Sequence, residues 1–134
     1  MRWMKWIALA LLLPALTGCG YNNIQTKDEA VKAGWSEVLN QYQRRADLVP
    51  SLVATVKGYA AQEERVLTEV TNARSRVGGV NLTADQAGDP AKLAEFQKAQ
   101  GELSGALQRL LVVTENYPDL KSNQNFLELQ SQLE

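Results

Sequence analysis

Apolar side chains recur at helical spacing along most of the chain. After residue 25 they fall at steps of three, four and seven, the spacing of one face of an α-helix. Interruptions near Pro50, at Gly78-Gly79 and at Tyr117-Pro118 divide this pattern into four segments. Antiparallel helices joined by short connections pack as up-and-down bundles. The pattern therefore predicts an all-α fold, an antiparallel up-and-down four-helix bundle.

The first two predicted helices meet near Pro50. Thr26-Lys27-Asp28-Glu29 fits a capping box, which predicts a helix beginning at Thr26. A residue that precedes proline is pushed away from helical backbone angles, so we expect a tight turn over residues 46–49. Asp47 would then cap a second helix that extends to Val77. The alternative is a single kinked helix from Thr26 to Val77.

The third predicted helix has the clearest boundaries. Asp89-Pro90 fits an N-cap followed by a first-turn proline, and Tyr117-Pro118 marks the end of the helix. Gly101 and Gly105 lie within it, and each costs about 1 kcal/mol relative to alanine. The two glycines indicate either a close crossing with a neighbouring helix or simple tolerance.

The fourth predicted helix is short. Ser122 can cap it, and only about three turns fit before Glu134 at 3.6 residues per turn. We therefore expect this helix to be short or truncated, so that a second copy of the chain could complete the bundle.

The N-terminal segment follows a different pattern. Two basic residues, Arg2 and Lys5, precede an apolar run from Trp6 to Leu16, and small residues follow. This order is typical of a secretory signal peptide. The run is shorter than the roughly 20 apolar residues that cross a bilayer. An uncleaved membrane helix is the alternative interpretation.

Cys19 is the only cysteine of the chain, and the preceding Leu-Thr-Gly resembles the bacterial lipobox. We expect cleavage before Cys19 and lipid on its thiol, which would also remove a free thiol from an exported protein. This divides the chain into a signal peptide (1–18), a lipid anchor and tether (19–25) and a helical bundle (26–134).

Composition argues against several function classes. Acidic and basic side chains nearly balance, 15 against 14, for a net charge of −1. Nucleic-acid binding would need clustered positive charge, so we expect none. The chain has no histidine, which removes the commonest general base and metal ligand. We therefore expect no enzymatic activity, no metal and no cofactor.

Two groups of polar residues are candidate sites. Glu63 falls on the apolar stripe of the second predicted helix, and we expect the Trp35 indole to hydrogen-bond its carboxylate, because an unpaired buried charge is costly. A metal or proton site is the alternative. Arg44, Arg45 and Asp47 form the second group. Arg44 and Asp47 have the spacing of an ion pair on one helix surface. The two arginines either tie down the turn or bind a lipid phosphate or an acidic partner.

Three segments of the chain are distinctive: QRRADLVPSLV at 43–53, VKGYA at 56–60 followed by Glu63, and ENYPDLK at 115–121 with Phe126. Together they resemble the LemA family. The resemblance implies a membrane-tethered four-helix bundle outside the bacterial cytoplasm, with no established enzymatic activity. Members usually begin with a transmembrane helix and continue past the position of Glu134, completing the last helix with a basic stretch that contains Tyr-Asn.

The expected function is that of an envelope lipoprotein that acts as a scaffold or protein-interaction module. Its expected partners are the membrane, through lipid on Cys19, an envelope protein, and a second copy of the chain. Gly20 is compatible with export to the outer membrane of a two-membrane cell, and the location would be the cell surface in a Gram-positive cell. A lipid-binding or membrane-remodelling module is the alternative.

Overall fold

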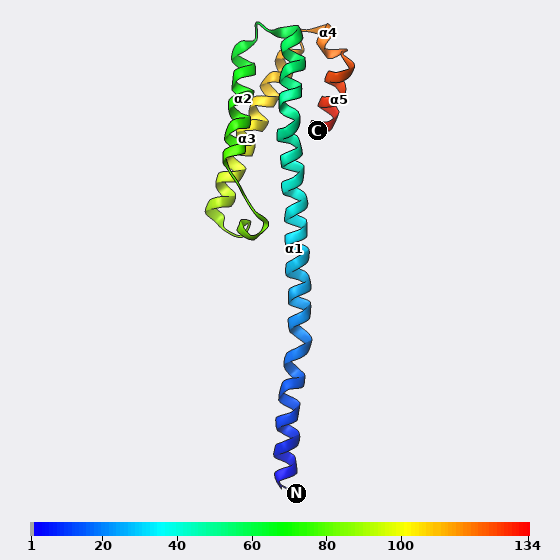
Figure 1. Cartoon of the computed structure of the whole chain (residues 1–134), viewed down its shortest axis with the longest axis vertical. Coiled ribbons are helices and arrows are strands. Elements are labelled where there is room, and N and C mark those ends of the chain that lie inside the picture. The colour runs from blue at the N-terminus through cyan, green and yellow to red at the C-terminus, as the bar shows by residue number, and fades with distance from the viewer. Residues whose placement is uncertain (1) are drawn as a thin grey trace.

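The computed structural model describes residues 2–134, apart from the side chains of Arg2, Lys5 and residues 8–19. The described residues are almost entirely helical and contain no strand, so the prediction of an all-α fold is confirmed (Figure 1). The elements in chain order are α1 (Arg2–Ala60), α2 (Glu64–Gly79), the 3₁₀ helix η1 (Ala84–Gln86), α3 (Pro90–Thr114), α4 (Pro118–Lys121) and α5 (Gln124–Leu133).

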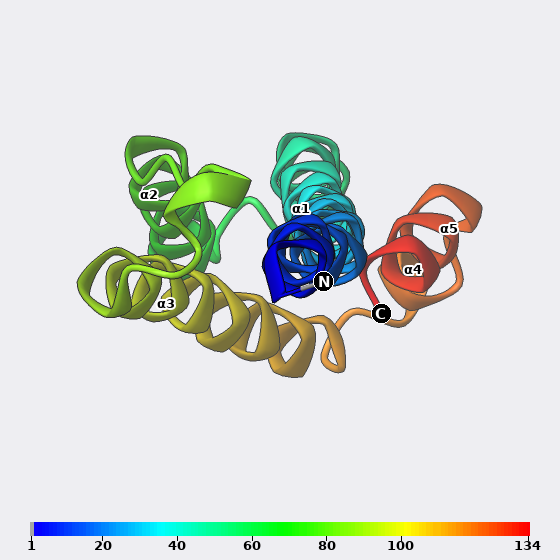
Figure 2. The same ribbon diagram turned by 90° about the horizontal axis from the view of Figure 1, so that it is seen from below.

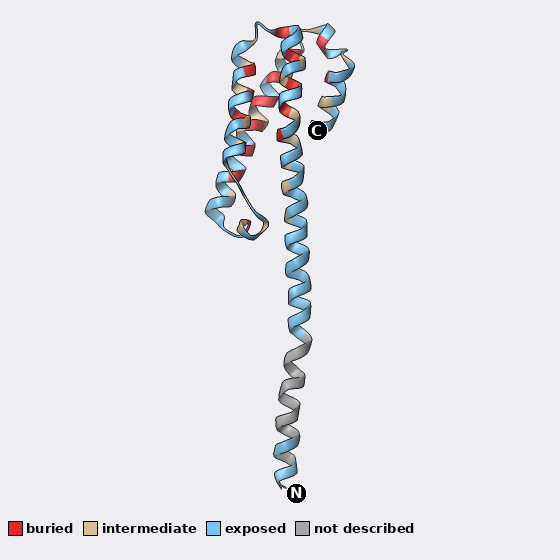
Figure 3. Cartoon of the chain, viewed as in Figure 1, coloured by how far each residue is buried: buried red, intermediate tan, exposed pale blue. Residues whose placement is uncertain are grey.

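The long helix α1 belongs to two regions of the molecule. Residues 20–41, which we call the stem, are almost all exposed, whereas residues 42–134 form a packed head (Figure 3). Within the head, α2 and α3 lie on one side of α1, and α4 and α5 lie on the other (Figure 2). The upper part of α1 is therefore enclosed by helices, and the stem extends away from them (Figure 1).

The core of the head joins α1, α2, α3, α4 and α5. Its side chains recur at the helical spacing seen in the sequence, and fully burying each large one contributes about 1.5–3 kcal/mol. Those with no more than 2% of their surface exposed include Val49, Leu52, Val56, Val70, Leu103, Leu110, Leu120 and Phe126.

The turn predicted just before Pro50 does not exist, and neither does the alternative kinked helix to Val77. Helix α1 continues through Pro50 and ends at Ala60. Proline in a helix lacks the N–H that would bond the carbonyl four residues earlier, here that of Ala46. The guanidinium of Arg74, on α2, donates to this carbonyl through Nε at 2.9 Å. A tertiary contact thus satisfies the group that Pro50 leaves free.

Two of the predicted helix starts are also wrong. Thr26 lies inside α1 and does not cap it: its hydroxyl donates to the carbonyl of Asn22 at 2.8 Å. Asp47 lies inside the same helix, where its carboxylate accepts a hydrogen bond from the Gln43 amide at 2.9 Å. Both residue types cap helices from outside, and continuation of α1 places them in its interior.

The later helix boundaries agree better with the sequence. Asp89 caps α3 as predicted, accepting from the backbone amide of Ala91 at 3.0 Å. Helix α3 ends at Thr114, slightly before the predicted end. Helix α5 is capped by Asn123, which accepts from the Phe126 amide at 3.1 Å, and not by Ser122.

The two glycines of α3 do not mark a close helix crossing. A Cβ added at Gly101 would meet nothing within 4 Å. One added at Gly105 would meet only the Arg109 side chain, at 3.4 Å. Both glycines are therefore tolerated and are not required by a neighbouring backbone.

Candidate functional site

Cys19 lies outside the described side chains, so its lipidation stays a prediction. Among the residues that the structure describes, no helix combines the length and apolarity needed to cross a membrane.

The predicted contact between Trp35 and Glu63 is wrong. Trp35 lies in the stem, whereas Glu63 lies beyond the far end of α1. At 1.5 Å per residue, Trp35 is about 38 Å from Ala60 along the helix axis. The contact was predicted from a turn near Pro50, and without that turn the two residues cannot meet.

Glu63 instead belongs to a polar cluster where α1 meets α2. Its Oε1 accepts from the Tyr117 hydroxyl at 2.9 Å, and that hydroxyl accepts from the Gln62 amide at 2.8 Å. Nearby, the amide of Asn123 donates to the Tyr59 hydroxyl at 2.8 Å. We call these five residues the distal cluster. They tie the α1–α2 turn to the segments that precede α4 and α5.

The distal cluster is a network of hydrogen bonds that includes one carboxylate, that of Glu63. Donation to Glu63 is the main cause that raises the pKa of the Tyr117 phenol above its ordinary value, because the bond favours the neutral phenol. In the described part of the chain, no three His, Cys, Asp or Glu side chains gather as a metal site would require.

The second candidate group separates in space. Asp47 accepts from Gln43, and the expected ion pair with Arg44 is absent from the ion pairs of the described side chains. Arg44 is exposed, whereas Arg45 is half-buried and reaches α3. This difference in burial follows from position around the helix. Arg45 lies four residues before the buried Val49 and therefore on the same face of α1.

The Arg45 guanidinium bonds only to uncharged groups. Its Nη1 donates to the Ser104 hydroxyl at 2.9 Å, and Nη2 donates to the backbone carbonyl and side-chain oxygen of Gln100 at 2.9 and 3.2 Å. Its Nε is buried without a hydrogen-bond partner. The guanidinium carbon lies 5.8 Å from the centre of the Tyr42 ring. Burial lowers the pKa of Arg45 below its ordinary value, although the group stays charged at neutral pH.

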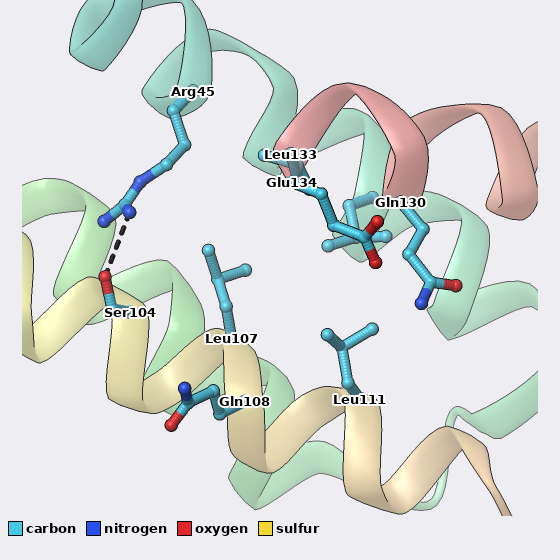
Figure 4. A pocket seen from close by; sticks show the side chains of 9 residues that line it. Arg45, Ser104, Leu107, Gln108, Leu111, Gln130, Leu133 and Glu134 are labelled. Carbon is cyan, nitrogen blue, oxygen red and sulfur yellow. Dashed lines mark hydrogen bonds between the residues drawn. The ribbon is translucent and has the colours of Figure 1, made fainter.

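Two adjoining cavities open beside Arg45, where the end of α5 approaches α1 and α3. The first, of about 240 Å³, lies between Arg45 and a set of leucines (Figure 4). The second, of about 330 Å³, extends toward the stem. We call the two together the Arg45 groove. Residues lining the first are Arg45, Leu52, Ser104, Leu107, Gln108, Leu111, Gln130, Leu133 and Glu134; residues lining the second are Val38, Gln41, Tyr42, Arg44, Arg45, Gln132, Leu133 and Glu134.

Arg45 forms no ion pair among the described side chains. Glu134 lines both cavities, yet no ion pair joins its carboxylate to Arg45. The ion pairs of α3 lie elsewhere, on the exposed pairs Arg76–Glu102 and Arg109–Glu69. The groove therefore combines leucine walls with the half-buried guanidinium of Arg45 and the carboxylate of Glu134.

Fold and groove together define a class of protein: an all-α head with an interhelical groove, carried on a projecting helical stem. The model of the LemA family matches residues 34–134, which include the end of the stem and the whole head. The chain belongs to the LemA family. A search of curated proteins finds no match to this chain.

Proposed function

We propose that this protein is a membrane-anchored envelope lipoprotein whose head is a non-enzymatic docking module for another protein. The Arg45 groove is the observation that carries the docking role, because pockets that bind are concave and mostly apolar, with a few placed polar groups. The signal-like N-terminus and the lone Cys19 support the anchor.

The head is best interpreted as an up-and-down four-helix bundle with one short member. Helices α1, α2, α3 and α5 would be its four helices, and α4 would be part of the connection between the last two. In support, α1 packs against α2 and α5, and α2 packs against α3. Among the described residues α5 has 10 residues and α3 has 25. The Arg45 groove lies beside the last described residues of α5.

The stem favours a protein partner over the lipid-binding alternative. At 1.5 Å per residue, Gly20 lies about 38 Å from Arg45 along α1. An anchor at Cys19 would therefore allow the groove to stand far above the lipid headgroups. The part of the head that reaches lowest along the stem is near η1, where Lys32 pairs with Asp85 at 3.5 Å.

The residues of the groove also favour binding over catalysis. Its polar groups are arginine, serine, glutamine, the Tyr42 phenol and the Glu134 carboxylate, and the chain has no histidine to act as a general base. Ser104 accepts from Arg45, which does not activate it as a nucleophile.

Mass spectrometry and fractionation of the native protein test the anchor. We expect the mature protein to begin at a lipid-modified Cys19 and to sediment with membranes, and a Cys19→Ser variant to lose the membrane association. An intact Met1 with an unmodified thiol would refute this part of the proposal.

Cross-linking in intact cells tests the docking role. A photoreactive residue at Leu111, in the groove, should capture one discrete protein, and the same residue at exposed Val112 should not. Vesicle sedimentation of unlipidated chain is the counter-test: binding that disappears in the Arg44→Gln/Arg45→Gln double variant would favour the lipid-binding function instead.

A further inference from the structure

We infer that residues 80–89, which connect α2 to α3, form a strap that keeps α1 straight across Gly34. Release of the strap makes Gly34 a joint at which the first part of the stem bends relative to the head. This joint is present whether or not Cys19 is lipidated and whether or not the Arg45 groove binds a partner.

Burial along the stem shows where the strap lies. Of stem residues 20–41, only Trp35 and Leu39 are partly buried. Together with Lys32 they follow steps of three and four, so the three residues share one face of α1. Helix α1 packs against η1, the middle of the strap, which lies beside the stem at the lower end of α2 (Figure 1). The strap therefore covers this one face of the stem.

The strap contacts α1 on both sides of Gly34. Before the glycine, Lys32 Nζ lies 3.5 Å from Asp85 Oδ1. After the glycine, side chains of α1 and of the strap line a common cavity of about 100 Å³. At 1.5 Å per residue, these contacts extend over about 15 Å of the helix. The cavity-lining residues of the two segments are Leu39, Tyr42, Gln43, Val80, Asn81 and Leu82.

The strap is itself held in shape by hydrogen bonds. The backbone amide of Gln86 donates to the Thr83 carbonyl at 3.0 Å, and that of Asp89 donates to the Gln86 carbonyl at 2.9 Å. Ala87 is buried, and Asp89 caps α3. A segment fixed in this way can hold two points of α1 in line.

Gly34 is a weak point of α1. It is exposed, and a Cβ added there would meet nothing within 4 Å, so no neighbouring backbone requires a glycine. Glycine lowers the helix–coil equilibrium constant about fivefold relative to alanine. Pro50, which also disfavours the helix, is compensated by Arg74 of α2. The strap compensates for Gly34 in the same manner, through contacts from another segment.

The contact between the strap and Lys32 is one that can be released. The side chains of Lys32 and Asp85 are 49% and 79% exposed, so water and salt screen their ion pair. Lys32 also lies 3.3 Å from Asp28 of α1 itself. Lys32 can therefore leave Asp85 and still have a carboxylate partner, which lowers the free energy needed to open the strap.

Spin-label distances test the joint. The full chain carries Cys19→Ser and nitroxide labels on Lys27→Cys in the stem and Lys98→Cys on α3, both at exposed positions. Pulsed electron–electron double resonance measures the width of the distance distribution between the labels. Leu82→Ser with Asp85→Asn releases the strap. We expect this double variant to widen the distribution about twofold or more, because bent conformers become populated.

Gly34→Ala identifies the position of the joint. Added to the double variant, it should restore the width of the natural chain, because alanine strengthens the helix where the strap no longer does. Gly58→Ala is the matched control. It is the same substitution at another exposed position of α1 with open surroundings, but it lies in the head, so the distribution should stay wide.

A second label pair separates the joint from unfolding of the head. Labels on Lys57→Cys and Lys98→Cys both lie in the head, and the distribution of their distances should not change. If it does change, Asp85→Asn alone and about 1 M sodium chloride replace the double variant, because the Debye length is then about 3 Å and each treatment acts on the exposed ion pair. Each should widen the stem-to-head distribution part of the way.

Four results would overturn the inference. The first is a double variant whose distribution is as narrow as that of the natural chain, and the second is a natural chain as wide as the double variant. The third is a wide distribution that Gly34→Ala does not narrow, or that Gly58→Ala narrows equally. The fourth, where the double variant disturbs the head, is no widening by Asp85→Asn or by salt.

Discussion

Replacement of Pro50 by alanine should stabilise the protein and make the Arg74 hydrogen bond dispensable. Pro50 is exposed inside α1, so the substitution removes no buried contact. Proline within a helix is about 3 kcal/mol less favourable than alanine, and about 1 kcal/mol of this is offset because proline also restricts the unfolded chain. We therefore expect Pro50→Ala to raise the free energy of unfolding by about 2 kcal/mol.

Arg74→Met should lower the free energy of unfolding by different amounts in the natural chain and in the Pro50→Ala variant. In the natural chain it leaves the buried Ala46 carbonyl without its donor, and a lost bond of this kind costs about 1.5–3 kcal/mol. In the Pro50→Ala background the new amide at position 50 bonds the same carbonyl, so the loss should fall to about 0.5 kcal/mol or less. The two substitutions should thus be coupled by about 1–2.5 kcal/mol.

Urea unfolding followed by circular dichroism at 222 nm measures the four free energies of this double-mutant cycle. Arg76→Met is the matched control, because Arg76 pairs with Glu102 on the surface at 2.7 Å and does not contact Ala46. Its effect should be the same in both backgrounds. If Arg74→Met destabilises both backgrounds equally, Arg74 does not compensate for Pro50, and the explanation for the continuous helix fails.

Three further predictions concern the distal cluster, α3 and the core. The pKa of Tyr117 is raised in the folded state, so its hydrogen bond to Glu63 contributes fully to stability below the ordinary tyrosine pKa of 10.0. This contribution to stability is lost as the pH rises through the higher pKa of the folded state. Urea midpoints of Tyr117→Phe and the natural chain should therefore differ at pH 8 and converge above pH 10; a constant gap would contradict the assignment. Gly101→Ala should add about 1 kcal/mol of stability, since its Cβ meets no neighbour, and a lower melting temperature would disprove the open surroundings. Leu110→Ala should cost about 2–5 kcal/mol, whereas Leu127→Ala, at a side chain 45% exposed, should cost less than about 1 kcal/mol; similar losses would show that the core is misassigned.

The sequence predicts the helices and their buried faces well, because both depend on local periodicity. Leu52, Val56 and Leu103, for example, lie at apolar positions of the sequence with helical spacing, and each is buried. The first turn was misplaced because the effect of Pro50 depends on a contact with Arg74, which lies on another helix. No local signal contains that contact.

The errors at the candidate site have the same origin. With a turn before Pro50, Trp35 would lie near Glu63; with a continuous α1, the two are far apart. From the sequence we treated Arg44 and Arg45 alike. Their positions around the helix relative to the apolar Val49 could have shown that only Arg45 faces the core. The position of Arg45 on the helix could not predict its hydrogen-bond acceptors on α3, because these depend on how the helices pack.

The attachment of α5 has a consequence for the width of the Arg45 groove. The helix is held firmly at its beginning, where Asn123 caps it and bonds to Tyr59 and where Phe126 is buried. Its last residues are only partly covered, and Leu133 is one wall of both cavities. The described contacts of α5 are therefore concentrated at its first turn, and a change in the tilt of the helix would alter the width of the groove at Leu133. The binding free energy of a ligand would then include the free energy of moving this ten-residue helix. The harder the helix is to move, the narrower the range of ligand widths that the groove could accept.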